Sequence, residues 1–589
     1  MYVVATAGHV DHGKSTLVQA LTGMQPDRWE EERRRGLTID LGFVWATLPS
    51  GRDVAFVDVP GHERFLANML SGLAPVDVVV FVVAADEGWQ QQSTDHLDAC
   101  AALGVRHGLV VLTRADRADA AQIAATRARV RERLAPTELS DAPVVTVSAV
   151  TGEGLDEMRA ALDEVLAGLP ATDPEARVRV WLDRSFTIKG AGTVVTGTLS
   201  AGTLSEGDRL TLAARDGARE VAVRGLQSEE VQEGRVGPTN RVAVNLRGED
   251  AAGIHRGDAL LTPEAWWLTD TVDVGVVTGE GLADAPREVA AHIGTAELNA
   301  GLRRLDDAHA RLTLPRKLPL TRGDRFVLRA PGDHAVLAGV EVLDVDPPEL
   351  VGRGASRRRA AELPGLNLAA EVARRGAVRA ATLETMGWRV PGEAPAGVER
   401  RDGWLIDSGS LKRWAKELGE AVAGADRMNP GVARKAAVDL LGLPAGGLLD
   451  AAVAAAGLAL RDGRVVDPAR TVDLGAAEES VAQIEEWLGE EPFRAPEADE
   501  LADLRLGARE LAAAEKAGRI IRIGPDRSVI LLPDAPARAA EVLAGLPEPF
   551  TLSQARKALD TTRRIAVPLL EHMDTLGLTR REGNARRLR

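Results

Sequence analysis

The chain has 589 residues, 45% of them hydrophobic, and a formal net charge of −15, so we expect about three to five globular domains. The single cysteine, Cys100, excludes an intramolecular disulfide framework and is typical of a reducing cytosol. No apolar run reaches the length of a membrane span and no signal-type pattern opens the chain, so a cytoplasmic protein without membrane contact is expected. The acidic balance argues against a protein that coats nucleic acid and confines any such contact to patches.

The first predicted element is an apolar strand over residues 2–7, which leads into a glycine-rich turn and a helix. The stretch GHVDHGKS has the pattern GxxxxGK[ST] in the strand–loop–helix context that this pattern requires. Its glycines let backbone N–H groups turn toward phosphates, and the helix N-terminus adds a partial positive charge. The alternative is a chance glycine-rich turn. The predicted phosphate-binding residues are Gly8, Asp11, Gly13, Lys14, Ser15 and Thr16.

Mg²⁺ ligands are predicted from three separate segments. The Ser15 hydroxyl follows the phosphate-binding lysine. Asp58 ends the apolar strand VAFVD and can hold Mg²⁺ through water, and the Gly61 amide just after it can sense the γ-phosphate. Thr38 lies after a charged run, residues 27–35, where a switch threonine would close on Mg²⁺ and the γ-phosphate. The charged run itself is interpreted as a solvated, mobile segment.

Two later strands carry the residues expected to bind the base. The strand VVLT ends at Thr113, and Asp116 after it can accept two hydrogen bonds from guanine, a donor pair that adenine lacks. The Arg114 stem can cover the base. Ser148 and Ala149 follow the strand VVTV and can meet the guanine O6 by backbone amide. Four motifs in this order, each at the C-terminal end of an apolar strand, predict a doubly wound α/β sheet with GTP at the strand ends.

The middle of the chain is predicted to be β-rich. After a proline-rich linker near residues 169–178, hydrophobic residues alternate with period two, and Gly190, Gly192 and Gly197 read as bends or bulges of a small barrel. A second β-rich stretch runs from about residue 270 to 345. The predicted domains are therefore a GTPase domain over 1–172, a first barrel over 173–265 and a second barrel over 266–347.

The last third contains a repeat. Glycines recur at spacings of 60, 61 and 59 residues, each near the turn of a strand–turn–strand pattern that follows helical stretches. This period predicts four tandem winged-helix (α+β) domains, over 348–427, 428–475, 476–537 and 538–589. The alternative is a helical array with accidental hairpins. The repeated glycines are Gly403, Gly463, Gly524 and Gly583.

The final segment, residues 551–589, has nine basic and four acidic residues and so reverses the sign of the chain's charge. It reads as a helix–turn–helix capped by Thr561 or Thr562, with Pro568 either marking the start of the second helix or bending it. Its basic face is predicted to hold a nucleic-acid backbone, and the alternative is a solvated basic end. The predicted RNA-contacting residues are Arg556, Lys557, Arg563, Arg564, Arg580, Arg581 and Asn584.

The stretches GHVDHGKST, RGLTID, DVPGHE and TRAD resemble the translational GTPases related to elongation factor Tu. The resemblance implies that His62 orients the attacking water on the ribosome, with Val10 and Ile39 as an apolar gate. The chain departs from the family pattern at two places. Thr113 stands where Asn is usual and can supply one hydrogen bond but not an amide's pair, and Val150 stands where Lys is usual.

The chain also resembles the selenocysteine-specific elongation factors, and the resemblance reaches both ends of the chain. It is carried by ATAGHVDHGKSTL, DRWEEERRRGLTIDLGF, FVDVPGHERFLANML, LDRSFTIKGAGTVVTG, TNRVAVNL and GLTRREGN. This resemblance implies an amino-acid pocket at Asp183, Arg184 and Arg241, whose guanidiniums would favour a selenolate over serine. The alternative is an exposed Arg184–Asp183 salt bridge of little value. The resemblance also implies a ribosome-stimulated GTPase that delivers selenocysteyl-tRNA and grips a selenocysteine insertion hairpin in the mRNA, expected to be a monomer. The competing hypotheses are a general translational GTPase and a nucleotide-gated RNA-binding regulator.

Overall fold

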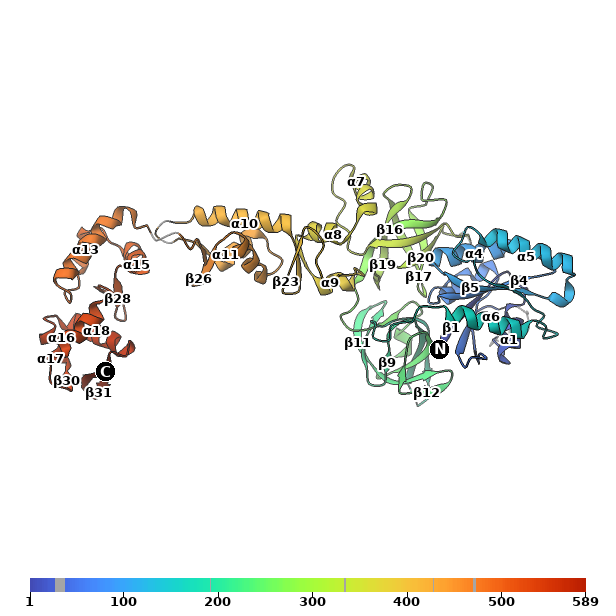
Figure 1. The fold of residues 1–589 in the computed structure, drawn as a ribbon, viewed down its shortest axis with the longest axis horizontal. Helices are drawn as coiled ribbons and strands as arrows, with labels where there is room; N and C mark the ends of the chain where they lie inside the picture. Colours follow the sequence, from blue (N-terminus) through green and yellow to red (C-terminus); the bar gives the residue numbers. More distant parts are fainter. Residues whose placement is uncertain (27–37, 191, 333–334, 427, 429, 470–472) are drawn as a thin grey trace. The chain divides into compact units, whose positions relative to one another are not determined.

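The computed structural model describes residues 1–26, 38–190, 192–332, 335–426, 428, 430–469 and 473–589. They form two compact units, one made of residues 1–371 with 379–393 and the other of residues 372–378 with 394–589 (Figure 1). The charged run predicted at residues 27–35 lies outside the described residues. No single described helix is long and apolar enough to span a membrane, and only a pair of helices bent by 99° would pass jointly.

The first unit begins with a six-stranded sheet in the order β2-β3-β1-β4-β5-β6, parallel except for β2, which runs antiparallel to β3. Helices α3, α4 and α5 cover one face, and α1 and α6 cover the other (Figure 1). This confirms the predicted α/β fold. The strands are β1 (Tyr2–Ala7), β2 (Gly42–Thr47), β3 (Asp53–Asp58), β4 (Val78–Ala84), β5 (His107–Thr113) and β6 (Val144–Thr146); the helices are α1 (Lys14–Thr22), α3 (Leu66–Leu73), α4 (Gln91–Leu103), α5 (Ala120–Leu134) and α6 (Leu155–Ala167).

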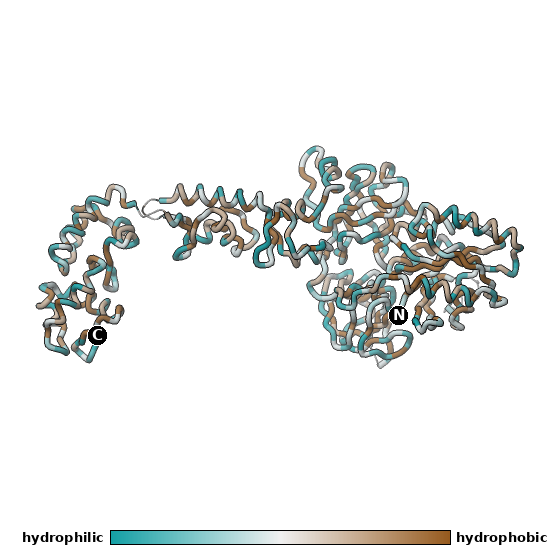
Figure 2. The backbone as a smooth tube through the Cα atoms, in the orientation of Figure 1, coloured by the Kyte–Doolittle hydropathy of each residue, from teal (hydrophilic) through white to brown (hydrophobic). Residues whose placement is uncertain are grey.

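The sequence pattern explains why the predicted motifs meet at one edge of this sheet. The middle strand β4 is buried along its whole length, as a parallel strand covered on both faces must be, and Figure 2 shows hydrophobic residues along the central strands. Because β1, β3, β5 and β6 run in the same direction, their C-terminal ends lie on the same side. The loops that carry the phosphate, Mg²⁺ and base motifs leave from those ends.

Two closed six-stranded barrels follow, which confirms the predicted β-rich middle. The first runs β10-β15-β7-β8-β14-β11 and closes through the β10–β11 pair, and the second runs β16-β19-β18-β17-β20-β21. Gly197 sits where a Cβ would lie 2.5 Å from the Trp181 carbonyl oxygen, so a close approach of strands requires glycine there. The strands are β7 (Arg179–Ile188), β8 (Gly192–Leu199), β9 (Leu204–Ser205), β10 (Arg209–Ala214), β11 (Gly217–Ser228), β12 (Val231–Glu233), β13 (Arg235–Val236), β14 (Asn240–Leu246), β15 (Ala259–Leu261), β16 (Leu268–Gly279), β17 (Glu288–Ile293), β18 (Ala296–Arg304), β19 (His309–Pro319), β20 (Arg325–Arg329) and β21 (Ala338–Asp344).

The last third contains four helix-plus-hairpin modules. Each repeated glycine lies at the turn of a hairpin, with φ of 77° at Gly403, 72° at Gly463, 93° at Gly524 and 60° at Gly583. A positive φ explains why glycine recurs there. The elements are α7 (Ala355–Glu362), α8 (Leu368–Arg375), β22 (Ala377–Arg379), α9 (Ala380–Thr385), β23 (Val398–Arg401), β24 (Trp404–Asp407), α10 (Ser408–Ala423), β25 (Val432–Ala433), α11 (Arg434–Leu441), α12 (Leu449–Ala455), β26 (Ala459–Arg461), β27 (Arg464–Val466), α13 (Glu478–Glu490), α14 (Ala498–Asp503), α15 (Ala508–Lys516), β28 (Ile521–Ile523), β29 (Val529–Leu531), α16 (Ala535–Leu543), β30 (Phe550–Thr551), α17 (Leu552–Ala558), α18 (Arg563–Thr575), β31 (Thr579–Glu582) and β32 (Ala585–Leu588).

The last two modules share one hydrophobic core. Buried residues from α13, β29, α16 and α18 pack into a single cluster that includes Leu488, Leu531, Leu543 and Leu569. Helix α16 spans the predicted boundary between residues 537 and 538. The third and fourth winged helices are therefore continuous in their packing, although each has its own hairpin.

Candidate functional site

The glycine-rich loop between β1 and α1 is shaped to present backbone N–H groups. Gly8 has φ +129°, and a Cβ there would lie 2.1 Å from the carbonyl oxygen of Val82, so the loop packs directly on β4. Gly13, at φ 83°, is the N-cap of α1 and has no side chain to occupy the helix N-terminus. That terminus is a site where phosphate oxygens bind. The predicted Thr16 is exposed on α1, and Asp11 adopts φ 62° in the loop.

Lys14 is buried beneath this loop. Its Nζ donates hydrogen bonds to the carbonyl oxygens of Gly8 at 2.9 Å and His9 at 2.8 Å. Burial lowers the pKa of Lys14 to about 8, only partly opposed by the Asp58 carboxylate. A desolvated ammonium gains strongly from an anionic partner, so the site favours a polyphosphate ligand.

Helix α4 holds the same loop from the side. The Gly8 N–H donates to Nδ1 of His96 at 3.1 Å, and the Val10 N–H donates to Oε1 of Gln92 at 3.1 Å. Burial, with a further contribution from the Lys14 charge, lowers the pKa of His96 to about 3. His96 is therefore neutral at physiological pH, and its Nδ1 remains a hydrogen-bond acceptor for the loop.

The three predicted Mg²⁺ ligands lie together. The Ser15 Oγ donates to Oδ2 of Asp58 at 2.6 Å and lies 3.0 Å from Oγ1 of Thr38. Asp58 is itself oriented by the Thr6 hydroxyl at 2.8 Å. Two hydroxyls and a carboxylate suit a small hard cation that keeps several waters. This set contains one carboxylate, and the described parts of the chain hold no cluster of three or more His, Cys, Asp or Glu ligands.

The structure also brings together the residues predicted to bind the base. The Ser148 Oγ donates to Oδ1 of Asp116 at 2.6 Å, and this bond lowers the pKa of Asp116. The carboxylate is thus ionised and held in one orientation. Ala149 is half-buried in the following turn, whereas Val150 is 77% exposed and points to solvent.

Thr113 has a different role from the one expected at its position. Its buried hydroxyl donates to the carbonyl oxygen of His12 at 2.6 Å, so it ties the base-binding strand to the phosphate loop. Arg114 adopts φ 55° and donates to the Asp11 carbonyl oxygen and to Glu87. Both side chains therefore brace the phosphate loop.

Gly61 lies against the phosphate loop, and His62 follows it. A Cβ on Gly61 would approach Nζ of Lys14 to 2.4 Å and the Val10 nitrogen to 2.6 Å, so no larger residue fits there. The Nδ1 of His62 accepts a hydrogen bond from the Arg64 N–H at 3.2 Å. Because Nδ1 accepts this bond, Nε2 is the ring nitrogen left to face other groups, and His62 is half-buried.

The first barrel places its predicted pocket residues next to the α/β domain. Asp183 accepts two hydrogen bonds from Arg241, one of them at 2.7 Å, and a third at 2.7 Å from Thr196. Arg184 instead reaches the α/β domain, where its Nη2 donates to Asp40 at 3.1 Å and to the Leu41 carbonyl oxygen at 2.7 Å. The alternative of an Arg184–Asp183 salt bridge is therefore wrong. A β-bulge between Leu182 and Arg184 lets the neighbours diverge.

Both pocket arginines stack on one aromatic ring. The guanidinium of Arg241 lies 3.6 Å from the centroid of Phe43, and that of Arg184 lies 5.1 Å from it. Phe43, both arginines and Thr196 line a cavity of about 200 Å³ between β2 and the barrel. Cation–π contact holds the guanidiniums in place without consuming their N–H donors.

The basic end of the chain forms the expected helix–turn–helix. Helix α18 begins at Arg563 after Thr562 as N-cap, and Pro568 lies inside the helix. Among the described residues, the side chains of Lys557, Arg563 and Arg580 have no hydrogen-bond or ion-pair partner, and these residues are exposed. The other predicted residues differ in environment: Arg564 donates to the Ala495 carbonyl oxygen, Arg556 to that of Thr561 and Arg581 to that of Gly583, while Asn584 is exposed.

Comparison with known proteins extends this picture. Residues 1–168 match the elongation factor Tu GTP binding domain, residues 269–349 match the β-barrel domain of the selenocysteine-specific elongation factor, and residues 541–588 match an elongation factor SelB winged helix. The chain is 31% identical over 626 residues to the selenocysteine-specific elongation factor of Escherichia coli (strain K12), an alignment that covers 100% of this chain and 98% of that protein. This chain belongs to the selenocysteine-specific elongation factors.

Other members of this family agree with that assignment. The selenocysteine-specific elongation factor of Desulfomicrobium baculatum is 37% identical over 359 residues, which cover 58% of this chain and 55% of that protein. A crystal structure of a bacterial selenocysteine-specific elongation factor superposes with a TM-score of 0.81 at 26% identity and covers 100% of this chain and 99% of that one. As a family member, the chain is a translational GTPase with an elongation factor Tu-type GTP-binding domain.

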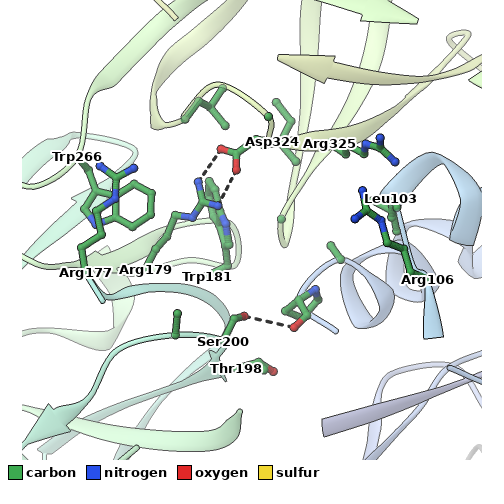
Figure 3. A pocket seen from close by; sticks show the side chains of 18 residues that line it. Leu103, Arg106, Arg177, Arg179, Trp181, Thr198, Ser200, Trp266, Asp324 and Arg325 are labelled. Carbon is green, nitrogen blue, oxygen red and sulfur yellow. Dashed lines mark hydrogen bonds and ion pairs between the residues drawn. The ribbon is translucent and has the colours of Figure 1, made fainter. Parts of the chain in front are cut away.

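A second cavity of this elongation factor, of about 360 Å³, lies where the GTPase domain meets both barrels (Figure 3). Two of its arginines are engaged with other side chains: Arg179 pairs with Asp324 in a bidentate geometry, and Arg177 stacks 4.0 Å over Trp266. No residue of the phosphate loop lines it. The Arg179–Asp324 pair joins the two barrels.

The residues that sequence reasoning missed are those whose partners are distant along the chain. Gln92 and His96 support the phosphate loop from α4, and Asp40 and Phe43 support the barrel pocket from the GTPase domain. The stretch TIDLGF contains Asp40 and Phe43, but only its threonine belongs to a pattern with a known chemical role. The one signal for Asp40 and Phe43 was that they lie two and five residues after the switch threonine.

Proposed function

We propose that this GTPase delivers selenocysteyl-tRNA to the ribosome at recoded UGA codons and docks on a selenocysteine insertion hairpin in the mRNA through its last winged helix. One observation carries the proposal most directly. Two guanidiniums stack on Phe43 in a cavity, and one of them, that of Arg184, is bound by Asp40, two residues after the switch threonine of the nucleotide site. Such a cavity suits a small anionic side chain whose binding is linked to GTP.

Selenocysteine and serine differ in charge at neutral pH. A selenol is far more acidic than an alcohol, so selenocysteine enters the pocket as an anion and serine as a neutral hydroxyl. A hydrogen bond to a charged group contributes about 1.5–3 kcal/mol, which corresponds to about a tenfold to hundredfold preference for the selenolate. Asp183 fixes Arg241, and Arg184 supplies the less saturated donor edge.

For GTP hydrolysis the residues take separate roles. Lys14 binds the β- and γ-phosphates, Asp116 recognises guanine, and the Gly61 amide faces the γ-phosphate. Mg²⁺, held by Ser15, Thr38 and Asp58, neutralises phosphate charge when bound. His62 orients the attacking water when the ribosome engages it; the close packing of Gly61 on the loop supports this placement. The ribosome thus triggers GTP hydrolysis at a site whose phosphate- and Mg²⁺-binding residues are already in place.

The RNA proposal rests on the fourth winged helix. Three exposed cations project from the helix–turn–helix and the wing, and among the described residues their side chains contact no hydrogen-bond or ion-pair partner. They are Lys557, Arg563 and Arg580. Unpaired exposed cations are available for phosphate contacts, and contacts of this kind position an RNA hairpin rather than read its bases. Asn584 at the wing turn is the candidate for a base contact.

Ester protection tests this function. The protein with GTP is mixed with one tRNA carrying either selenocysteine or serine, and spontaneous deacylation of each is followed. We expect protection of the selenocysteyl ester alone, and loss of that difference in Arg184→Ala. Arg209→Ala, which removes an exposed paired arginine from the same barrel, is the matched control.

Other outcomes point to the competing functions. Protection of both esters would favour a general translational GTPase. Protection of neither, with RNA hairpin binding intact, would favour a nucleotide-gated RNA-binding regulator.

A further inference from the structure

A short segment, residues 38–43, joins the nucleotide site to the barrel pocket; we call it the linking segment. At its start, Thr38 lies 3.0 Å from the Ser15 hydroxyl. Two residues on, Asp40 accepts a hydrogen bond from Arg184 at 3.1 Å, and the Leu41 carbonyl oxygen accepts another at 2.7 Å. The Mg²⁺-binding group and the pocket arginine are thus connected through very few peptide units.

The donors of the two pocket arginines are used differently. Both terminal nitrogens of Arg241 are engaged by Asp183, which is 7% exposed, and one of them also by Thr196. Arg184 uses only Nη2, whose two bonds go to the linking segment. Among the described residues its Nε and Nη1 have no hydrogen-bond partner. Arg184 therefore offers the donor edge for an anion, and the linking segment sets where that edge points.

The two arginines also differ in what holds them. Arg241 is fixed within the barrel by Asp183 and lies over Phe43, which is held by pairing of β2 with β3 opposite Val57. Both anchors are regular structure. Arg184 is held by Asp40 and Leu41, which precede β2 and adjoin the switch threonine. A displacement of Thr38 should therefore move the groups that hold Arg184 and leave those that hold Arg241 in place.

We infer that Asp40 and the Leu41 carbonyl are positioning groups that make the pocket's affinity for the selenocysteyl end depend on the bound nucleotide; this rests on the proposed function. When Thr38 lies at Ser15, Asp40 and Leu41 hold the Arg184 Nη2, and its free edge faces the ligand. When Thr38 leaves, these bonds break and Arg184 is no longer oriented. Because coupling between sites is reciprocal, the aminoacyl end also favours the GTP state.

The charge of Asp40 has a second, opposing effect. It partly neutralises Arg184 and would by itself weaken attraction of an anion. The Asp40 and Arg184 side chains are 33% and 24% exposed, so solvent screens this repulsion between Asp40 and the ligand. We expect the orientation of Arg184 by its two hydrogen bonds to outweigh this repulsion. The Asp40→Ala variant separates the two effects, because loss of orientation weakens binding of the anion whereas loss of repulsion strengthens it.

The test measures the affinity of selenocysteyl-tRNA for the full-length protein at saturating non-hydrolysable GTP analogue and at saturating GDP. In Asp40→Ala we expect about a tenfold loss in the GTP-analogue form, equivalent to one charge-assisted hydrogen bond, and less than about a twofold change with GDP. Asp40→Asn keeps an acceptor oxygen and should restore part of the loss. Asp163→Ala, which removes a carboxylate paired with Arg52 elsewhere on the GTPase domain, is the matched control.

A double-mutant cycle sharpens the inference. If Thr38 acts on Arg184 through Asp40, Asp40→Ala should have no further effect in a Thr38→Ala background. An equal loss in both nucleotide forms, or tighter binding in the GTP-analogue form, would overturn the inference while leaving the pocket intact. Failure of the wild-type protein to distinguish selenocysteyl from seryl ester would overturn the proposed function and the inference together.

Discussion

The phosphate loop and, under the proposed function, the fourth winged helix both bind phosphate-bearing ligands, but by opposite means. In the loop, the cation Lys14 is 6% exposed and surrounded by ordered backbone groups. In the winged helix, Lys557, Arg563 and Arg580 extend into solvent. Because Lys14 is buried, the phosphate loop should bind its ligand tightly, and the loss of a single contact should weaken that binding strongly. Because the cations of the winged helix are exposed, each should add a small, separate contribution to the binding free energy, and that contribution should fall as ionic strength rises.

This difference predicts how each site fails. A buried charge that loses its partner keeps its desolvation cost, so removing one group should cost several kcal/mol. An exposed charge is screened over about 10 Å at 0.1 M salt, so removing it costs little and the loss shrinks as salt rises.

Lys14→Ala should give the largest effect. Truncating one member of a buried charged contact costs about 2–5 kcal/mol, so GTP and GDP should both bind at least about thirtyfold more weakly. A fluorescent-nucleotide titration measures this, with the exposed Lys189→Ala as control. A loss of less than threefold would show that the backbone N–H groups alone hold the phosphates.

Arg563→Ala combined with Arg580→Ala should weaken hairpin RNA binding about tenfold at low salt, and should reduce the salt slope by about 1 for each phosphate that is no longer neutralised. Titrations at several salt concentrations measure both quantities. Arg538→Ala, on α16 and paired with Asp534, should leave both unchanged. An unaltered slope in the double variant would remove these residues from the RNA interface.

Nucleotide affinity should fall at alkaline pH. The pKa of Lys14 in the free protein is about 8, below its ordinary value, and bound phosphate stabilises the charged form and raises it. Below pH 8 the lysine is protonated in both states. Above pH 8 binding must take up a proton, and affinity should decline toward tenfold per pH unit. Titrations from pH 7 to 9 test this, and a flat profile would contradict it.

Arg586→Ala should change stability rather than RNA binding. Its guanidinium is 11% exposed and donates to Asp574 at 2.9 Å, so it braces the wing against α18. We expect about 1–2 kcal/mol lower unfolding free energy and less than a twofold change in hairpin affinity. A large change in the salt slope would instead place Arg586 among the residues that bind phosphate.

Much of the fold was predictable because its signals are local. The phosphate loop is a contiguous stretch whose glycines are required by φ at Gly8 and Gly13, and the wing glycines recur because each turn needs positive φ. Pairings between distant segments were not predictable. Arg184 binds Asp40, not its neighbour Asp183, because a bulge and the docking of the barrel decide its direction. Thr113 bonds to His12 for a similar reason.

The common core of the third and fourth winged helices has a mechanical consequence. Since Leu488 and Leu531 pack in the same cluster as Leu543 and Leu569, the two modules should unfold in a single cooperative step. A fragment that starts at residue 538 would expose half of that cluster, whereas one that starts near residue 474 would keep it whole. If an RNA bound to α18 is pulled, the shared core should therefore transmit the force to the third module, and the two modules should resist it together.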